Sequence, residues 1–225
     1  MLELFLAAAT SVALTAAAPA LCLPADPAEV VTEHRVLDRD EGQPLQVYAV
    51  SHRGEDGPFG YDSSRVVIYD AACGVRHLQV FDGAVETHFR SAKLGDQSVL
   101  VATVMYPGGS GVGYEQVILG YDTFSVYALA PERLRYSNMD GFYLGDLGGG
   151  RGDGLILWMA IWDGAHYDPH RYTVTTYRWR DGHFNGPKVR TTHKHYDPDP
   201  ETVAKALGLP ADQTDMDRFK LFDAR

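Results

Sequence analysis

Cysteine is scarce in this chain, which has only Cys22 and Cys73 among 225 residues. Their spacing is not that of a zinc motif or a Cys-x-x-Cys redox pair, which argues against cysteine-based metal sites and thiol catalysis. Two cysteines are compatible with an oxidising compartment. If a leader is cleaved after Ala20, both remain and a Cys22–Cys73 disulfide would pin the N-terminus. If Cys22 is removed or acylated, Cys73 is a lone buried thiol.

The chain has fewer basic than acidic residues. The chain has 20 Lys and Arg against 30 Asp and Glu, for a net charge of −10. This balance argues against nucleic acids and anionic membranes as partners, because both repel an acidic surface. It favours a basic partner, or it simply keeps an exported protein soluble. With 45% hydrophobic and 22% charged residues, the composition is that of a globular protein with a packed core.

Familiar catalytic motifs are also missing. The sequence has no P-loop, no dinucleotide fingerprint and no cysteine–histidine pair with a known local signature. Ser110 is not at a nucleophile elbow, because the segment after it reads as a strand rather than a helix. His193 and His195, with the nearby Asp197 and Asp199, lack a third neighbouring metal ligand in sequence. We therefore predict that the protein is not an enzyme.

The N-terminus resembles an export signal. Residues 4–23 are almost entirely Ala, Leu, Val, Thr and Ser, and Pro19 and Pro24 end the run before it could form a convincing membrane span. Ala18-Pro19-Ala20 is a small-residue cleavage site, although Glu3 stands where a basic residue is expected. We predict a signal peptide over residues 1–25 and a periplasmic or exported protein. Lipidation of Cys22 is the weaker alternative, because Leu21 precedes it where a small residue is required.

An internal repeat organises the middle of the chain. His34 and His88, like Val47 and Val101, are offset by 54 residues, and a third unit starts near Phe142. Each unit has an apolar strand, a polar or glycine-rich loop, a second strand, a tight turn and a third strand. The first strands are residues 45–50, 99–105 and 155–161. The loops that follow are residues 52–64, 106–113 and 163–170. The second strands are residues 65–69, 114–121 and 171–179. A period in the fifties is typical of propeller blades.

These units predict an all-β fold: an irregular or incomplete β-propeller-like array of about three four-stranded repeats over residues 26–190. Residues 191–225 would form a capping segment with one or two short helices. Asp199 is a good N-cap and Pro200 suits the first turn of a helix that ends before Gly208. A second helix is expected over residues 212–222.

The third unit contains a glycine-rich stretch with two carboxylates, Asp146 and Asp153. It resembles the aspartate-rich calcium loop of FG-GAP or VCBS repeats, in which oxygen ligands alternate before an apolar strand. Glycine occupies the intermediate positions here. The resemblance makes Asp146 and Asp153 candidate Ca²⁺ ligands. The alternative is a glycine-rich turn that keeps its shape without an ion.

A second glycine-rich stretch, residues 108–116, lies between two apolar runs. Its Ser-Gly-x-x-Tyr pattern resembles the inhibitory loop of periplasmic lysozyme inhibitors, in which a serine enters the active cleft of a cell-wall hydrolase. The resemblance makes this stretch the candidate partner-binding site. Its residues would be Gly109, Ser110, Gly111, Gly113, Tyr114 and Glu115, with Tyr114 as a rigid aromatic anchor.

Together these features resemble the periplasmic immunity proteins that bacteria pair with secreted peptidoglycan hydrolases. The resemblance implies an inhibitor that occludes the cleft of a basic, lysozyme-like effector. One alternative is a carbohydrate- or wall-binding module that uses Trp158, Trp162, Tyr167 and Trp179 as stacking platforms. The other is a structural envelope protein without such a partner.

Overall fold

The computed structural model describes residues 21–22, 26–39, 42–54, 60–108, 111–130 and 133–210. These residues form an all-β fold with three antiparallel sheets of four to five strands, none of which closes within the described part. The all-β class and the three repeated units are therefore confirmed, but each sheet has one more strand before the apolar strand that was expected to come first. A propeller-like arrangement of the sheets is not confirmed.

Each sheet is a meander of consecutive strands, so that neighbours in sequence are neighbours in space. The first sheet contains β1 (Glu29–Leu37), β2 (Leu45–Arg53), β3 (Tyr61–Tyr69) and β4 (Val75–Asp82). The second contains β5 (Glu86–Leu94), β6 (Gln97–Pro107), β7 (Val112–Tyr121) and β8 (Val126–Ala128), with β9 (Leu134–Ser137) also paired to β7. The third contains β10 (Gly141–Asp146), β11 (Asp153–Ile161), β12 (Arg171–Arg180) and β13 (His183–Thr191).

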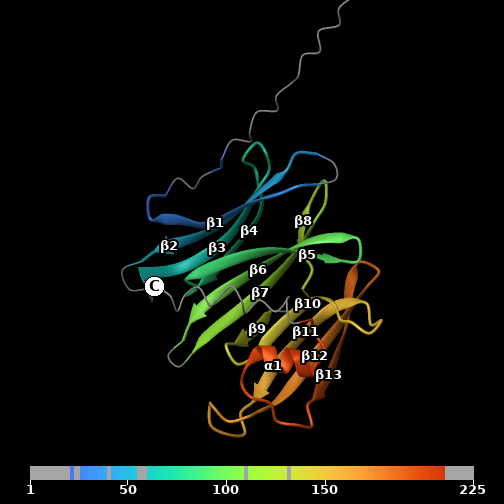
Figure 1. Cartoon of the computed structure of the whole chain (residues 1–225). Helices are drawn as coiled ribbons and strands as arrows, with labels where there is room; N and C mark the ends of the chain where they lie inside the picture. The colour runs from blue at the N-terminus through green and yellow to red at the C-terminus, as the bar shows by residue number, and fades with distance from the viewer. Residues whose placement is uncertain are drawn as a thin grey trace, which may run out of the picture.

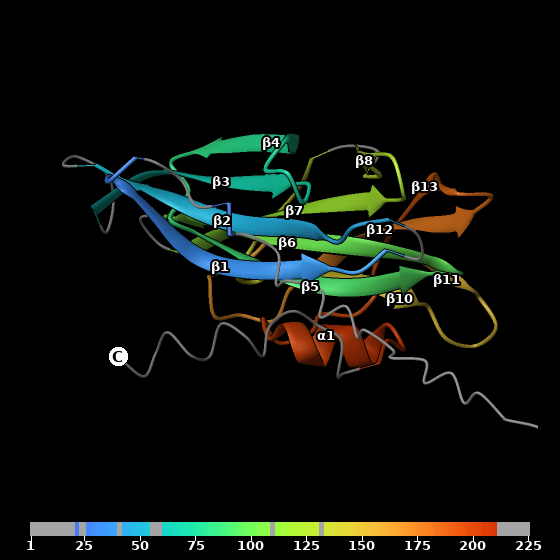
Figure 2. The same cartoon turned by 90° about the horizontal axis from the view of Figure 1, so that it is seen from above.

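The three sheets follow one another from top to bottom in Figure 1. Seen from above, β1, β5 and β10 lie on the side of the molecule that carries the helix, and β4, β8 and β13 lie on the opposite side (Figure 2). The second strands β2, β6 and β11 are apolar along most of their length and buried on both faces. Continuous apolar runs are what strands covered on both faces require.

Two apolar clusters hold the stack together. The first joins the first and second sheets and includes Val47, Phe89 and Leu100. The second joins the second and third sheets and includes Val101, Phe142 and Leu155. Each fully buried side chain of this size contributes roughly 1.5–3 kcal/mol relative to an exposed one. The second sheet is thus the centre of the molecule.

The two outer faces of the stack are covered differently. Helix α1 (Pro200–Ala206) packs Val203 and Ala204 against Trp158 on the third sheet. Asp199 is its N-cap and accepts a hydrogen bond from the Thr202 amide at 3.0 Å, which confirms the predicted start of this helix. The second expected helix, over residues 212–222, lies outside the described residues. The described part contains no helix long and apolar enough to cross a membrane.

On the first sheet the corresponding cover is the segment around Cys22, which packs against Tyr48 and Val50. Cys22 and Cys73 form a disulfide, as expected if both cysteines remain in the protein, whereas cleavage after Ala20 stays a prediction. The Cys22 amide also donates to the Tyr48 hydroxyl at 3.2 Å. The disulfide therefore fixes Cys22 against the outer face of the first sheet.

Candidate functional site

The expected partner-binding loop is a tight hairpin rather than a long loop. Residue pairing continues to Pro107 and Val112, so only residues 108–111 connect β6 to β7. Gly109 and Ser110 lie outside the described residues. A Cβ on Gly108 would lie 2.6 Å from the Gly111 carbonyl oxygen, and a Cβ on Gly111 would lie 2.9 Å from Asn138 Oδ1. Glycine is therefore needed at position 108, where the close atom belongs to the backbone, whereas at position 111 the Asn138 side chain could move aside.

Tyr114 is not at the hairpin tip, which corrects the expectation that its ring is an exposed anchor. It lies within β7 opposite Met105 and is 6% exposed. Its ring packs at 5.4 Å from that of Tyr136, inside the cluster between the second and third sheets. β7 begins at Val112, two residues before the expected start of the strand. Tyr114 therefore lies within the sheet, and its side chain faces inward.

Glu115 requires the same correction, because it is 1% exposed and belongs to a buried polar cluster. Arg135 Nε donates to its carboxylate at 2.7 Å, and the Tyr106 hydroxyl donates to the same oxygen at 3.1 Å. Burial and the neighbouring carboxylate raise the pKa of Tyr106 to about 12, so its hydroxyl remains a donor. This cluster links β6, β7 and β9 at the base of the hairpin.

An open cavity of about 480 Å³ lies beside the hairpin, between the first and second sheets. Its walls include Tyr61, Met105, Pro107 and Val112, with Glu86 as a charged member. A cavity with apolar walls and one charged group resembles the sites where proteins bind a ligand or an anchor residue of a partner. Its residues come from five strands of two sheets, β1, β3, β5, β6 and β7, so no local sequence pattern could have revealed it.

A carboxylate–histidine cluster connects β1 to β5 next to this cavity. His88 Nδ1 lies 3.3 Å from a Glu33 oxygen, and His88 Nε2 lies 3.2 Å from a Glu86 oxygen. Glu33 also accepts from the Phe89 amide at 3.0 Å, on the edge of the second sheet. Hydrogen bonds to Glu33 and Glu86 outweigh burial and raise the pKa of His88 to about 9. The cluster is therefore an ion-paired link between sheets.

The loop between β11 and β12 exposes an aromatic group. Trp162 is 59% exposed and Tyr167 is 88% exposed, and the His166 ring lies between them at 5.5 and 5.3 Å from their centroids. Of the other expected stacking residues, Trp158 is fully buried beneath α1, which corrects its assignment as a surface platform. Trp179 is partly buried and packs edge-on against Phe184.

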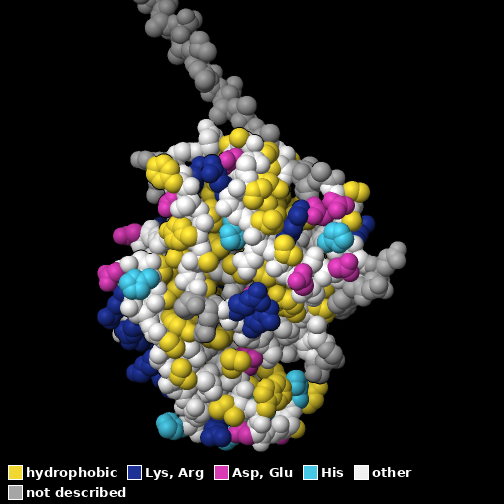
Figure 3. All heavy atoms as spheres, turned by 180° about the vertical axis from the view of Figure 1, so that it is seen from behind, with side chains coloured by type: hydrophobic (Ala, Val, Ile, Leu, Met, Phe, Trp, Pro, Cys, Tyr) yellow, Lys and Arg dark blue, Asp and Glu magenta, His cyan; other side chains and the backbone are white. Residues whose placement is uncertain are grey.

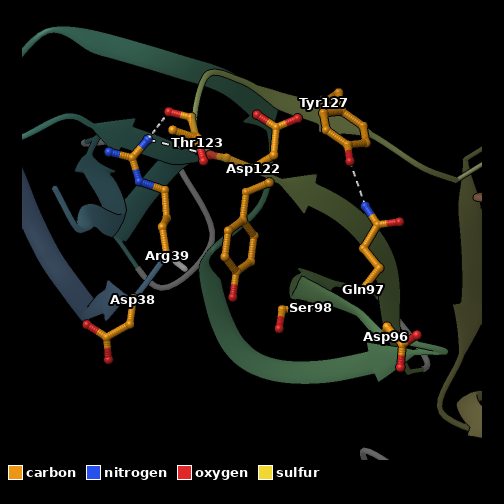
Figure 4. Close-up of a pocket in the computed structure, with 9 residues that line it drawn as sticks. Asp38, Arg39, Asp96, Gln97, Ser98, Asp122, Thr123 and Tyr127 are labelled. Atoms are coloured by element: carbon orange, nitrogen blue, oxygen red, sulfur yellow. Dashed lines mark hydrogen bonds between the residues drawn. The ribbon is translucent and has the colours of Figure 1, made fainter. Parts of the chain in front are cut away.

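A polar hollow of about 240 Å³ lies at the other end of the second sheet, near the turns of the first and second sheets (Figure 4). Arg39 donates to the Thr123 carbonyl oxygen and to that of Gln43, both at 2.6 Å. Gln97 donates to the Tyr127 hydroxyl at 2.6 Å, as the dashed line in Figure 4 shows. These side chains hold turns together, so the hollow is a junction between the two sheets.

Asp146 and Asp153 lie opposite each other on β10 and β11. The Gly148 amide donates to Asp146 at 2.9 Å, and the Gly95 amide donates to Asp153. Arg151 donates to the carbonyl oxygens of Leu147 and Gly148, which a calcium ion would need as ligands. A guanidinium group in this position fits Ca²⁺ poorly. Calcium binding stays a prediction, which melting curves with chelator and with added calcium would test.

Two histidines of the third sheet's surroundings lie near one carboxylate, that of Asp163. His195 Nε2 lies 3.8 Å from Asp163 Oδ2, and the buried His170 lies 3.8 Å from the other oxygen of Asp163. Arg171 pairs with the same carboxylate at 3.0 Å. Within the part of the chain that the structure describes, no three His, Cys, Asp or Glu side chains are placed to hold an ion.

No family model, curated protein or solved structure matches this chain. Two features of the surface are the strongest indications of function: the tight β6–β7 hairpin with its neighbouring cavity, and the aromatic group of the β11–β12 loop.

Proposed function

We propose that the protein is a non-catalytic inhibitor of a peptidoglycan hydrolase and that the β6–β7 hairpin enters the cleft of that enzyme. The observation that carries this proposal is the position of the hairpin beside an open apolar cavity. A projecting hairpin next to an apolar recess is a surface that another protein can bind in a complementary way. The resemblance of residues 108–114 to lysozyme-inhibitor loops agrees with this use.

The burial of Tyr114 and Glu115 changes how the inhibitor would work. The Tyr114 ring and the Glu115 cluster support the base of the hairpin, so the proposal assigns contact with the enzyme to Ser110, in the connection between β6 and β7, and to the rim at Pro107 and Val112. A hydrolase cleft holds two carboxylates. A serine hydroxyl can donate a hydrogen bond to one of them and accept one from a protonated other. The net charge of −10 would speed encounter with a basic enzyme.

Two further parts of the proposal concern compartment and architecture. The Cys22–Cys73 disulfide favours an oxidising, extracytoplasmic location, and it uses the sulfur that a lipid anchor would need. Three consecutive antiparallel sheets of four to five strands are compatible with an incomplete propeller whose outer faces are covered by Cys22 and α1. Blade-like repeats often present their loops as a common binding surface.

The test is a turbidity assay in which purified lysozyme-like hydrolases clear a cell-wall suspension while the protein is titrated in. Ser110→Trp should abolish inhibition, because an indole at the tip prevents entry into a narrow cleft. Phe124→Trp is the matched control, since it places the same ring at an exposed turn at the opposite end of β7. Equal inhibition by Ser110→Trp and wild type would show that the hairpin is not the inhibitory element. Absence of inhibition by the wild type would exclude the function.

A carbohydrate-binding module is the second candidate, favoured by the exposed rings of Trp162 and Tyr167. Aromatic faces of this kind can pack against the apolar faces of sugars. Sedimentation with purified peptidoglycan would separate the two functions. If the second candidate is right, Trp162→Ala with Tyr167→Ala should release the protein from the pellet, and Phe124→Ala should not.

A further inference from the structure

The third sheet carries a concentration of positive charge that the overall acidity of the chain conceals. Residues 171–195 contain six Lys and Arg residues and one acidic residue, Asp181. In the view from behind, Lys and Arg side chains gather along the lower left flank of the molecule (Figure 3). This is the flank on which β13 lies, at the lower right of Figure 1. Charge in this protein is thus distributed unevenly.

Strand pairing places the central members of this group on one face. Arg190 lies opposite Val174, Lys188 opposite Thr176, and Arg178 opposite Asn185. Val174 packs against α1, so Lys188 and Arg190 project from the same outer face of the third sheet. Alternate residues of a strand are about 7 Å apart. The two cations therefore form a regularly spaced row along the exposed strand β13.

The row borders a groove of about 350 Å³, here called the basic groove, which Arg151, Arg178, Lys188 and Arg190 line together with the polar side chains of Thr176 and Asn185. Among the described residues no Asp or Glu lines it. Arg190 also borders an adjoining hollow of about 380 Å³ that contains His193 and Lys194. Cations continue from one recess to the next along the edge of the sheet.

These cations differ from several arginines of the molecule, which lie next to a carboxylate. Arg35, Arg65, Arg76, Arg135 and Arg171 each lie within 4.0 Å of a carboxylate oxygen. Arg178, Lys188, Arg190 and Lys194 have no such partner among the residues that the structure describes. Arg178 is oriented by donating to the Arg151 carbonyl oxygen at 3.3 Å. A row of uncompensated cations in a concave surface concentrates anions.

We propose that the basic groove binds a ligand that carries several phosphate groups in series. Guanidinium groups recognise phosphate oxygens in a bidentate way, and an ammonium group adds a point charge. The spaced row suits successive phosphates, because each cation can meet a different group. A ligand with several phosphates is favoured over a single anion, because it can contact several of these cations at once. The proposal is independent of the hairpin and of the hydrolase.

Calorimetry with sodium tripolyphosphate tests the soluble form of this ligand, and sedimentation with phosphatidylglycerol vesicles tests a lipid surface, with phosphatidylcholine vesicles as the neutral reference. We expect binding to at least one probe, with an affinity that falls as salt is raised. Lys188→Glu with Arg190→Glu should weaken it at least tenfold. Lys93→Glu is the control, because Lys93 is exposed on β5 in the second sheet.

The variants should remain folded, since Lys188 and Arg190 are exposed on an edge strand, and melting temperatures would verify this. Charged residues on edge strands also prevent edge-to-edge association. If Lys188 and Arg190 serve only to prevent such association, one of two results is expected. Either wild type binds neither probe, or the Lys188→Glu and Arg190→Glu double variant binds as well as wild type. Either result would overturn the proposal.

Discussion

At the residue scale, Tyr114 leads to the first prediction. Tyr114→Ala should lower the free energy of unfolding by about 3 kcal/mol, because it empties a packed site between the second and third sheets. Tyr114→Phe keeps the ring and should cost much less. Chemical denaturation measures both. Trp162→Ala, which removes a larger but exposed ring, is the control and should leave stability nearly unchanged.

An unchanged stability of Tyr114→Ala combined with a loss of hydrolase inhibition would contradict this interpretation. It would show instead that the ring is available to a partner, as the sequence pattern suggested. Stability and inhibition must therefore be measured on the same preparations.

Tyr114 and Glu115 also show which part of the candidate site could not be predicted from the sequence. Four glycines nearby indicated a loop but not where pairing resumes, and β7 begins at Val112. The partner of Glu115 is Arg135 on β9, twenty residues along the chain, and no local pattern specifies this pairing. By contrast, the Cys22–Cys73 disulfide could be anticipated, because only two cysteines are present.

At the scale of elements, the link between β1 and β5 makes stability depend on pH. The pKa of His88 is raised to about 9 in the folded protein from 6.5, chiefly by its hydrogen bonds to Glu33 and Glu86. A raised pKa means that the folded state holds the proton more tightly. The stabilisation is therefore complete below about pH 6.5 and is lost as the pH rises through 9.

We expect His88→Gln to be less stable than wild type by about 2–3 kcal/mol at pH 6, with the difference shrinking towards pH 9.5. Unfolding by urea across this range measures it. His183→Gln, at an exposed position of β13, is the control and should show no such trend. If the free energies of unfolding of His88→Gln and wild type differ by the same amount at every pH, the loss of stability comes from packing and not from charge.

The strands themselves were largely predictable, because apolar runs separated by turn residues repeat with a constant period. Val47 and Val101 occupy equivalent places in β2 and β6, as the offset indicated. The cavity beside the hairpin and the Glu33–His88–Glu86 link were not predictable. Both depend on how two sheets pack, and side chains that are distant in sequence meet there.

At the scale of the whole molecule, the disulfide secures the N-terminal segment. Cys22 and Cys73 are separated by 51 residues. Closing a loop of this length stabilises the folded state by about 4 kcal/mol in the chain-entropy description. Cys22→Ser with Cys73→Ser should therefore lower the melting temperature by on the order of 10 °C.

Treatment of wild type with a reductant should reproduce this shift, and the double variant should not respond to reductant. Wild type that melts at the same temperature with and without reductant would show that the N-terminal segment contributes little to the fold.

The meander order of the sheets also has a consequence for how the molecule assembles in time. Each sheet is made from a continuous stretch of chain, and the disulfide joins residues that all belong to the first stretch. If the chain is exported as proposed, its N-terminal part enters the oxidising compartment first, and the first sheet can form and be locked by the disulfide while later residues are still crossing. The second and third sheets would then pack onto a surface that is already fixed. Helix α1 follows the third sheet in the chain and covers Trp158.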